Sequence, residues 1–176
     1  FLSQRSKQLI GKIVLIGISF VLILQWHDTV FASFLEKLHF RKDFVEKGNY
    51  KFLSETRSGI IAVHFNKEKG CDYIYGGGVF DGCFSVDPDA PNMIDRVYAI
   101  VSLHSAPKNI LVIGLSSGSW VRALTYSNVF EKIDVVEINH GYLDLIKKYP
   151  EHSKIFTDPR VTIHIDDGRR WLSRSK

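Results

Sequence analysis

The sequence predicts an α/β fold with a parallel sheet in its second half, and two observations carry that prediction. Three apolar-rich runs, each of strand length, alternate there with three runs of helical spacing. Strands that alternate with helices form parallel sheets, and buried parallel strands are apolar on both faces. The composition agrees, because 45% hydrophobic and 24% charged residues are the balance of a folded protein with one real core.

Residues 1–40 are predicted to form a hydrophobic helix followed by an amphipathic helix. Leu9 to Trp26 contain one charged residue, Lys12, and as a helix they span about 27 Å, enough to cross a bilayer core. We therefore expect a membrane anchor. A signal peptide cleaved behind Val30-Phe31-Ala32 and a buried core helix are the competing interpretations.

The amphipathic helix is predicted between Thr29 and Phe40 from apolar residues at helical spacing, Phe31, Phe34, Leu35 and Leu38. It would lie on the membrane or pack on the following domain.

Residues 41–90 are predicted to form a small β-domain of antiparallel hairpins. Its strands are expected at Gly59–Phe65, Tyr73–Tyr75 and Val79–Phe80, with Gly76-Gly77-Gly78 as a turn. Cys71 and Cys83 flank the second hairpin. They would pair in an oxidising compartment and remain thiols in the cytoplasm.

Residues 91–176 carry the predicted α/β alternation. The turn residues of Asp87–Asn92 mark its start, and a helix is expected at Met93–Leu103. The alternation then runs through a strand at Ile110–Ile113, a helix at Trp120–Tyr126, a strand at Ile133–Ile138, a helix at Tyr142–Lys148, a strand at Arg160–Ile165 and a helix at Arg169–Arg174.

Each predicted parallel strand ends in residues suited to a nucleoside, at the sheet edge where ligands bind in such folds. The first is followed by Gly114-Leu115-Ser116-Ser117-Gly118, whose glycines allow a tight turn and close approach to a ligand. At the tip of the second, Glu137 can accept hydrogen bonds from ribose hydroxyls. Asp166 and Asp167 end the third, before Gly168, and can accept from an adenine amine.

Other kinds of site have less support. Gly114 to Gly118 also fits Gly-x-Ser-x-Gly, which would make Ser116 a hydrolase nucleophile, but a hydrolase needs its acid and histidine after several further strands that this chain does not contain. Two cysteines and seven histidines show no metal-ligand spacing, so no metal is expected. The net charge is only +4 and the basic residues are scattered, so nucleic-acid binding is not expected.

The run from Asn109 to Trp171 resembles the nucleoside-binding half of the spermidine synthase family, the polyamine aminopropyltransferases. The resemblance rests on the glycine-rich turn, Val135-Val136-Glu137-Ile138, Asp158-Pro159-Arg160-Val161 and Ile165-Asp166-Asp167-Gly168-Arg169. Gly59 to Ser85 is similar to the family's small N-terminal β-domain. The hydrophobic helix resembles the membrane-bound bacterial members, in which several spans precede a synthase-like domain.

The resemblance implies a Rossmann-like (class I methyltransferase-like) fold, here its first half only, because the chain starts at Phe1 and stops before the family's fourth strand with its catalytic aspartates. Glu137 would hold the ribose of decarboxylated S-adenosylmethionine or methylthioadenosine, and Asp167 with Gly168 the adenine. The implied partners are an amine substrate, a membrane and a second copy of the chain, with the α/β domain in the cytoplasm.

The chain also departs from the family pattern. Ser117 stands where the family has the aspartate that meets the donor's ammonium group, and Asn92-Met93-Ile94 stands where the family usually has Tyr-(His/Gln)-Glu. Asp81 and Asp95 lie nearer the acceptor side, without a partner that the sequence identifies. We expect the full-length protein to transfer an aminopropyl group and this chain alone to show no turnover. The sequence does not identify the catalytic residues. An S-adenosylmethionine-dependent methyltransferase and a non-catalytic nucleoside-binding domain are the alternatives.

Overall fold

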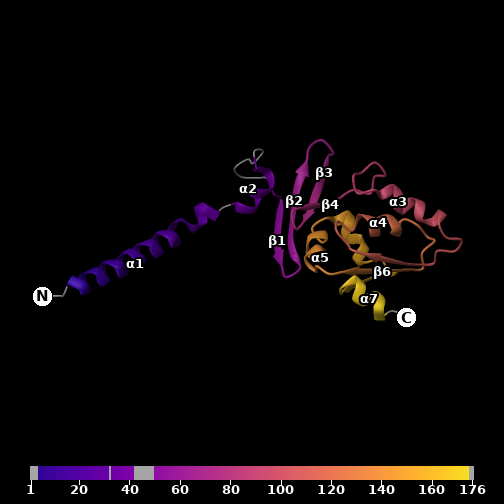
Figure 1. Ribbon diagram of the computed structural model, residues 1–176. Coiled ribbons are helices and arrows are strands. Elements are labelled where there is room, and N and C mark those ends of the chain that lie inside the picture. Colours follow the sequence, from indigo (N-terminus) through magenta and orange to yellow (C-terminus); the bar gives the residue numbers. More distant parts are fainter. Residues whose placement is uncertain (1–3, 32, 42–49, 175–176) are drawn as a thin grey trace. The chain divides into compact units, whose positions relative to one another are not determined.

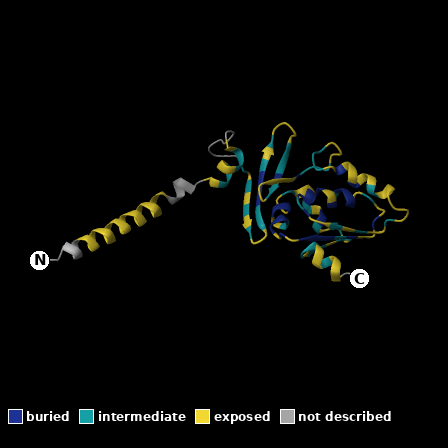
Figure 2. Cartoon of the chain, viewed as in Figure 1, coloured by how far each residue is buried: buried dark blue, intermediate teal, exposed yellow. Residues whose placement is uncertain are grey.

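The computed structural model describes residues 4–31, 33–41 and 50–174, and it divides into two compact units, Phe1–Val45 and Glu46–Lys176. The first unit contains α1 (Gln4–Phe31) and α2 (Phe34–Phe40) (Figure 1). Within the described residues, one helical segment, Gln8–Trp26 of α1, is long and apolar enough to cross a membrane, and none of it is buried (Figure 2). A signal sequence meets the same criteria, so the anchor and the signal peptide both stay predictions.

The second unit begins with an antiparallel sheet of four strands, in the order β1 (Phe52–Thr56), β2 (Gly59–Asn66), β3 (Cys71–Gly76) and β4 (Val79–Cys83). The predicted hairpins are confirmed, whereas β1 was not foreseen as a strand and β4 continues to Cys83. Gly77 and Gly78, with φ of 59° and 83°, form the β3–β4 turn in the left-handed region that glycine adopts without strain.

Cys71 and Cys83 are free thiols at the ends of β3 and β4. Burial raises the pKa of the Cys83 thiol, which makes it a poor nucleophile near neutral pH.

The predicted α/β fold with a parallel sheet is confirmed. β5 (Asn109–Ile113), β6 (Lys132–Glu137) and β7 (Val161–Ile165) pair in parallel in that order, a Rossmann-like arrangement. Its helices are α3 (Ile94–Ala99), α4 (Ser119–Thr125), α5 (Gly141–Ile146), α6 (Pro150–Ser153) and α7 (Gly168–Arg174), with 3₁₀ turns at Ile100–Ser102 and Lys154–Phe156.

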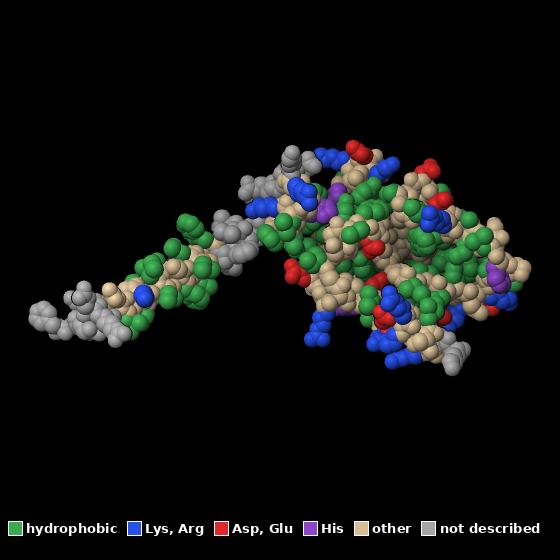
Figure 3. All heavy atoms as spheres, viewed as in Figure 1, with side chains coloured by type: hydrophobic (Ala, Val, Ile, Leu, Met, Phe, Trp, Pro, Cys, Tyr) green, Lys and Arg blue, Asp and Glu red, His purple; other side chains and the backbone are tan. Residues whose placement is uncertain are grey.

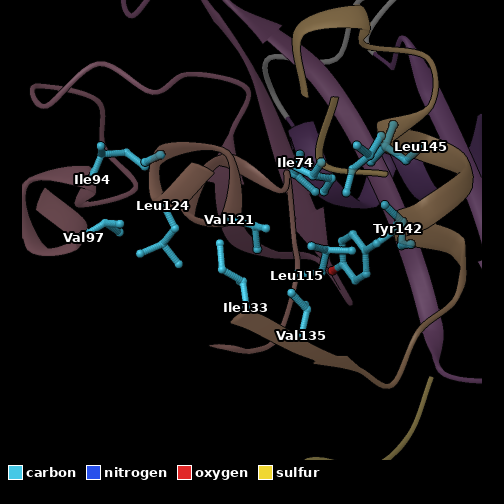
Figure 4. Close-up of a cluster of buried hydrophobic side chains, with 14 of the residues drawn as sticks. Ile74, Ile94, Val97, Leu115, Val121, Leu124, Ile133, Val135, Tyr142 and Leu145 are labelled. Atoms are coloured by element: carbon cyan, nitrogen blue, oxygen red, sulfur yellow. The ribbon is translucent and has the colours of Figure 1, made fainter. Parts of the chain in front are cut away.

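One hydrophobic core joins the two sheets (Figure 4). Ile61, Val63 and Ile74 of the antiparallel sheet belong to the same buried cluster as Ile133 and Val135 of β6. This shared core packs the antiparallel sheet against the parallel sheet, and the candidate site lies at the carboxyl ends of the parallel strands.

β5 lies at one edge of the parallel sheet. Leu111 and Ile113 on this strand are exposed, Ile113 to 55%. Such an apolar edge is a surface on which another strand can pair.

Candidate functional site

A cavity of about 1080 Å³ lies between the antiparallel sheet, α3 and the carboxyl ends of β5 and β6. Its wall is mostly apolar, and Figure 3 shows hydrophobic side chains around a hollow on this face of the second unit. The polar groups on the wall include those of β4, the Asn92 loop, α3, the glycine-rich turn, the end of β6 and α5. A large apolar pocket with few convergent polar groups is the usual form of a small-molecule site.

The glycine-rich turn after β5 depends on both of its glycines. Gly114 and Gly118 have φ of 90° and 72°, and a Cβ at Gly118 would lie 3.0 Å from the Cδ1 of Ile155. Ser116 between them has φ of 48°, which costs a residue with a side chain about 1 kcal/mol. The turn therefore holds a strained backbone at the cavity wall.

Ser116 is held at this position by the antiparallel sheet. Its hydroxyl donates a 2.6 Å hydrogen bond to the carbonyl oxygen of Asp81 in β4. The hydroxyl therefore meets a carbonyl and not the imidazole that a hydrolase nucleophile requires, and within the described residues no histidine bonds to it. This arrangement gives the nucleophile interpretation of Gly-x-Ser-x-Gly no support.

Ser117 and Ser119 form a buried hydroxyl chain under the turn. Ser117 donates to Ser119 at 2.7 Å, and Ser119 donates to the carbonyl oxygen of Cys83 at 2.9 Å. Since the Ser119 proton is used, the His152 Nε2–H donates to the Ser119 oxygen, 3.1 Å away. Burial lowers the pKa of His152 to about 4, so the ring is neutral near pH 7.

Glu137 bridges two loops at the end of β6. Its side chain is 4% exposed, and its two oxygens accept 2.6 Å hydrogen bonds from the backbone N–H groups of Leu115 and Asn139. Desolvation raises the pKa of this carboxyl, and the backbone bonds oppose that rise. Each oxygen still has a lone pair for a ligand hydroxyl, and Glu137 lines the cavity.

The residues predicted at the end of β7 have local partners. Asp167 accepts from the backbone N–H of Arg170 at 3.0 Å and so caps α7. Asp166 pairs with the Arg170 guanidinium, which lowers the pKa of that carboxyl. A Cβ at Gly168 would lie 2.6 Å from Ile113, so glycine allows α7 to approach β5.

The structure thus brings half of the predicted site residues to the cavity. Gly114, Ser116, Ser117 and Glu137 line it, whereas Gly118, Asp166, Asp167 and Gly168 are not among the described residues of its wall. The adenine assignment of Asp167 and Gly168 stays a prediction. Within the described part of the chain, no group of three or more His, Cys, Asp or Glu residues is placed to hold a metal ion.

The sequence did not identify the pair of Asp81 and Tyr142 on the same wall. The Tyr142 hydroxyl of α5 donates a 2.5 Å hydrogen bond to Asp81 Oδ2. Desolvation raises the pKa of Asp81 and the bond from Tyr142 opposes the rise, while burial and the Asp81 carboxyl raise the pKa of Tyr142. The only signal in the sequence was the glycines on either side of Asp81, at positions 76–78 and 82.

Asn92 also lies on the wall, and it joins α3 to the neighbouring elements. Its side-chain N–H group donates to the carbonyl oxygens of Cys83 and Ser85, while its own carbonyl accepts from Trp120 Nε1 at 2.7 Å. The Asn92 Oδ1 atom is buried and has no hydrogen-bond partner among the described residues. An unpaired buried acceptor costs about 1–3 kcal/mol, so a donor that reached it would be stabilising.

The chain is similar to proteins of one known family. Residues 96–176 match the family described as the spermine/spermidine synthase domain. The polyamine aminopropyltransferase of Prochlorococcus marinus (strain AS9601) is 33% identical over 152 residues, which cover 84% of this chain and 52% of that protein. The spermine synthase of Arabidopsis thaliana is 40% identical over 72 residues, 40% of this chain and 20% of that protein.

Two solved structures share the fold. The crystal structure of spermidine synthase from Thermotoga maritima matches with a TM-score of 0.58 and 21% identity, over 73% of this chain and 44% of that one. A spermidine synthase in complex with the transition-state analogue AdoDATO matches with a TM-score of 0.56 and 21% identity, over 70% and 42% of the two chains. The chain spans about half the length of these structures and of the Prochlorococcus relative.

Proposed function

Because the chain belongs to the spermidine synthase family, we propose that its α/β domain binds decarboxylated S-adenosylmethionine or methylthioadenosine, and that the full-length protein transfers an aminopropyl group to an amine. The observation that carries the proposal is Glu137, a buried carboxylate at the end of β6 that lines the cavity beside the glycine-rich turn. A carboxylate at this strand end is suited to accept hydrogen bonds from ribose hydroxyls.

The cavity has the composition that this ligand requires. Its volume of about 1080 Å³ exceeds that of a nucleoside thioether, and its apolar wall suits an adenine ring. A sulfonium carbon is already electrophilic, so the protein's contribution is to position the donor and to exclude competing water. Within this chain, Glu137 and the glycine-rich turn would do the positioning.

A binding experiment tests the ribose assignment. Glu137→Ala should weaken methylthioadenosine binding by about 1.5 to 3 kcal/mol, roughly 10- to 150-fold, because a charge-assisted hydrogen bond is lost. Isothermal titration calorimetry measures this, with thermal unfolding as a check that the variant is folded. The matched control is Glu131→Ala, which removes an exposed carboxylate that pairs with Lys108 at the surface. Equal affinity of the Glu137 variant and the native protein would remove the assignment.

The same titrations separate the proposed donor from that of a methyltransferase. If decarboxylated S-adenosylmethionine binds more tightly than S-adenosylmethionine, the site favours an aminopropyl donor. The reverse order would favour the methyltransferase, whose donor carries an additional carboxylate.

We also propose that α1 anchors the protein in a membrane. The support is its length and the largely apolar stretch between Leu9 and Trp26, in which Lys12 is the one charged residue and all of which is exposed.

A further inference from the structure

Asp81 occupies a defined position between the antiparallel sheet and the glycine-rich turn. Two elements hold it: Tyr142 of α5 donates to its Oδ2 at 2.5 Å, and Ser116 donates to its backbone carbonyl at 2.6 Å. The side chain is therefore oriented by a group 61 positions later in the sequence, and its backbone by the loop that closes the cavity.

Two glycines provide the space for this arrangement. A Cβ at Gly76 would lie 2.6 Å from the Tyr142 hydroxyl oxygen, and a Cβ at Gly82 would lie 3.1 Å from Ser116 Oγ. Any larger residue at either position would displace one of the two groups that hold Asp81. The β3–β4 hairpin is thus shaped around the carboxylate.

The carboxylate has no cationic partner among the described residues. Its recorded side-chain donors are both neutral hydroxyls: Tyr142 donates to Oδ2, and a hydrogen bond from Ser116 also lowers the pKa of Asp81. The other ionisable groups on the cavity wall are Glu137, whose pKa is raised in part by the Asp81 charge, and Arg96, which forms no recorded ion pair with Asp81. Desolvation disfavours an unpaired carboxylate at such a place, and a bound cation would offset that cost.

Asn92 provides a second hydrogen-bond acceptor on the cavity wall. Asn92 lies near Gly82, where a Cβ would be 3.7 Å from the Asn92 Cβ, and the Asn92 Oδ1 is buried without a partner in the described part of the chain. Two acceptors close to Gly82, one charged and one neutral, match a group that carries several N–H donors. An alkylammonium group has three.

We propose that Asp81, oriented by Tyr142, binds the ammonium group on the sulfonium side chain of the nucleoside donor. This inference rests on the proposed function, because the nucleoside must occupy the Glu137 side of the cavity. Asp81 and Glu137 line the same cavity, so a donor with its ribose at Glu137 can extend its alkylammonium chain toward Asp81.

Three probes with the same nucleoside isolate the ammonium group. Methylthioadenosine is neutral, its S-methyl sulfonium derivative carries one positive charge without an ammonium group, and decarboxylated S-adenosylmethionine carries both. For Asp81→Asn in the full chain, calorimetry should show at least a tenfold loss of affinity for the third probe and less than a twofold change for the other two. Asp95→Asn, which removes an exposed carboxylate on α3 away from the wall, is the control.

Tyr142→Phe gives an independent measurement if Asp81→Asn does not fold. It keeps the Asp81 charge but removes the orienting donor, so affinity for decarboxylated S-adenosylmethionine should fall three- to tenfold while methylthioadenosine binding is retained.

The outcomes distinguish the two proposals. Methylthioadenosine that fails to bind the native protein contradicts the proposed function, and the inference fails with it. Native binding of all three probes, with equal losses for all three in Asp81→Asn, would assign Asp81 a structural role only. Equal losses for the two sulfonium probes would assign it to the sulfonium, and an unchanged affinity for the third probe would exclude it from the site.

Discussion

At the scale of single residues, the buried polar side chains near the cavity mainly form hydrogen bonds that hold the backbone of the surrounding loops. Glu137 holds the backbone of Leu115 and Asn139, and Ser119 ties the glycine-rich turn to β4 through the Cys83 carbonyl. His152 completes this network from α6 and is 8% exposed. Glu137 and His152 are the titratable members of this network, and burial shifts the pKa of each.

The fold should lose stability in acid through His152. An unfolded histidine has a pKa of about 6.5, and burial lowers that of His152 to about 4. Between these two pH values His152 is protonated in the unfolded chain but not in the folded one. The contribution of neutral His152 to the free energy of unfolding is therefore complete above pH 6.5 and declines as the pH falls toward 4. At pH 5 the loss is about 2 kcal/mol relative to high pH.

Urea unfolding of the full chain in detergent micelles, at pH 7 and at pH 5, measures this loss. His152→Gln keeps an N–H donor for Ser119 but does not titrate, so its stability should fall less over the same interval. His104→Gln, at an exposed histidine, should behave as the native protein does. An identical decline in the native protein and in His152→Gln would mean that His152 is not the group responsible.

At the scale of elements, the β3–β4 hairpin and α5 meet at one crowded point. Gly76 ends β3, and a Cβ there would lie 2.6 Å from the Tyr142 hydroxyl oxygen, with the next contact, Asp81 Oδ2, at 3.4 Å. The φ of Gly76 is not in the left-handed region, so the backbone conformation would accept alanine. The steric contact with the Tyr142 hydroxyl is what would disfavour it.

Gly76→Ala should therefore destabilise the fold by about 1–3 kcal/mol through overpacking. Removing the hydroxyl relieves the contact, so the same substitution in a Tyr142→Phe background should cost less. Thermal or urea unfolding of the four proteins in this double-mutant cycle gives the coupling energy. Additive costs would show that the Tyr142 hydroxyl is not what excludes a side chain at position 76.

Elements whose signal is local were predictable, and those that depend on tertiary contacts were not. The parallel strands are short apolar-rich runs between segments of helical spacing, so β5, β6 and β7 follow from the sequence. β1 was missed because Phe52–Thr56 has only two apolar residues, which are adjacent and give no alternation, and α6 because four residues starting with Pro150 have no helical period. β1 is stabilised by pairing with β2 and by packing on α5.

The same distinction applies to the site. Gly114 and Glu137 could be predicted because the ends of neighbouring parallel strands meet whatever the rest of the chain does. Asp81 and Tyr142 could not be paired, since they meet only through the packing of one sheet on the other. Asp166 and Asp167 were correctly placed at a strand end, but their local bonds to Arg170 follow from α7, which begins directly after them.

At the scale of the whole molecule, the two units present different kinds of apolar surface. The second unit has its own core, and its exposed large apolar residues are spread over several elements, with Leu111 and Ile113 of β5 among them. The described part of the first unit is α1 and α2, and the Leu9–Trp26 stretch of α1 has no polar face to present to water. A helix of this kind is stable in a bilayer, whereas a single apolar edge strand favours self-association in concentrated solution.

Deleting Phe1 to His39 should therefore move the protein from the membrane fraction to the soluble fraction, because no other described helix is long and apolar enough to span a bilayer. The measurement is fractionation of expressing cells, with carbonate washing of the membranes and dilute samples to limit association through β5. The matched control is the full chain with Leu15→Lys and Ile16→Lys, two charges that interrupt the apolar run and should also release the protein. Retention of the deleted form in carbonate-washed membranes would contradict the anchor, and a native chain that begins at Ser33 would establish the signal peptide instead.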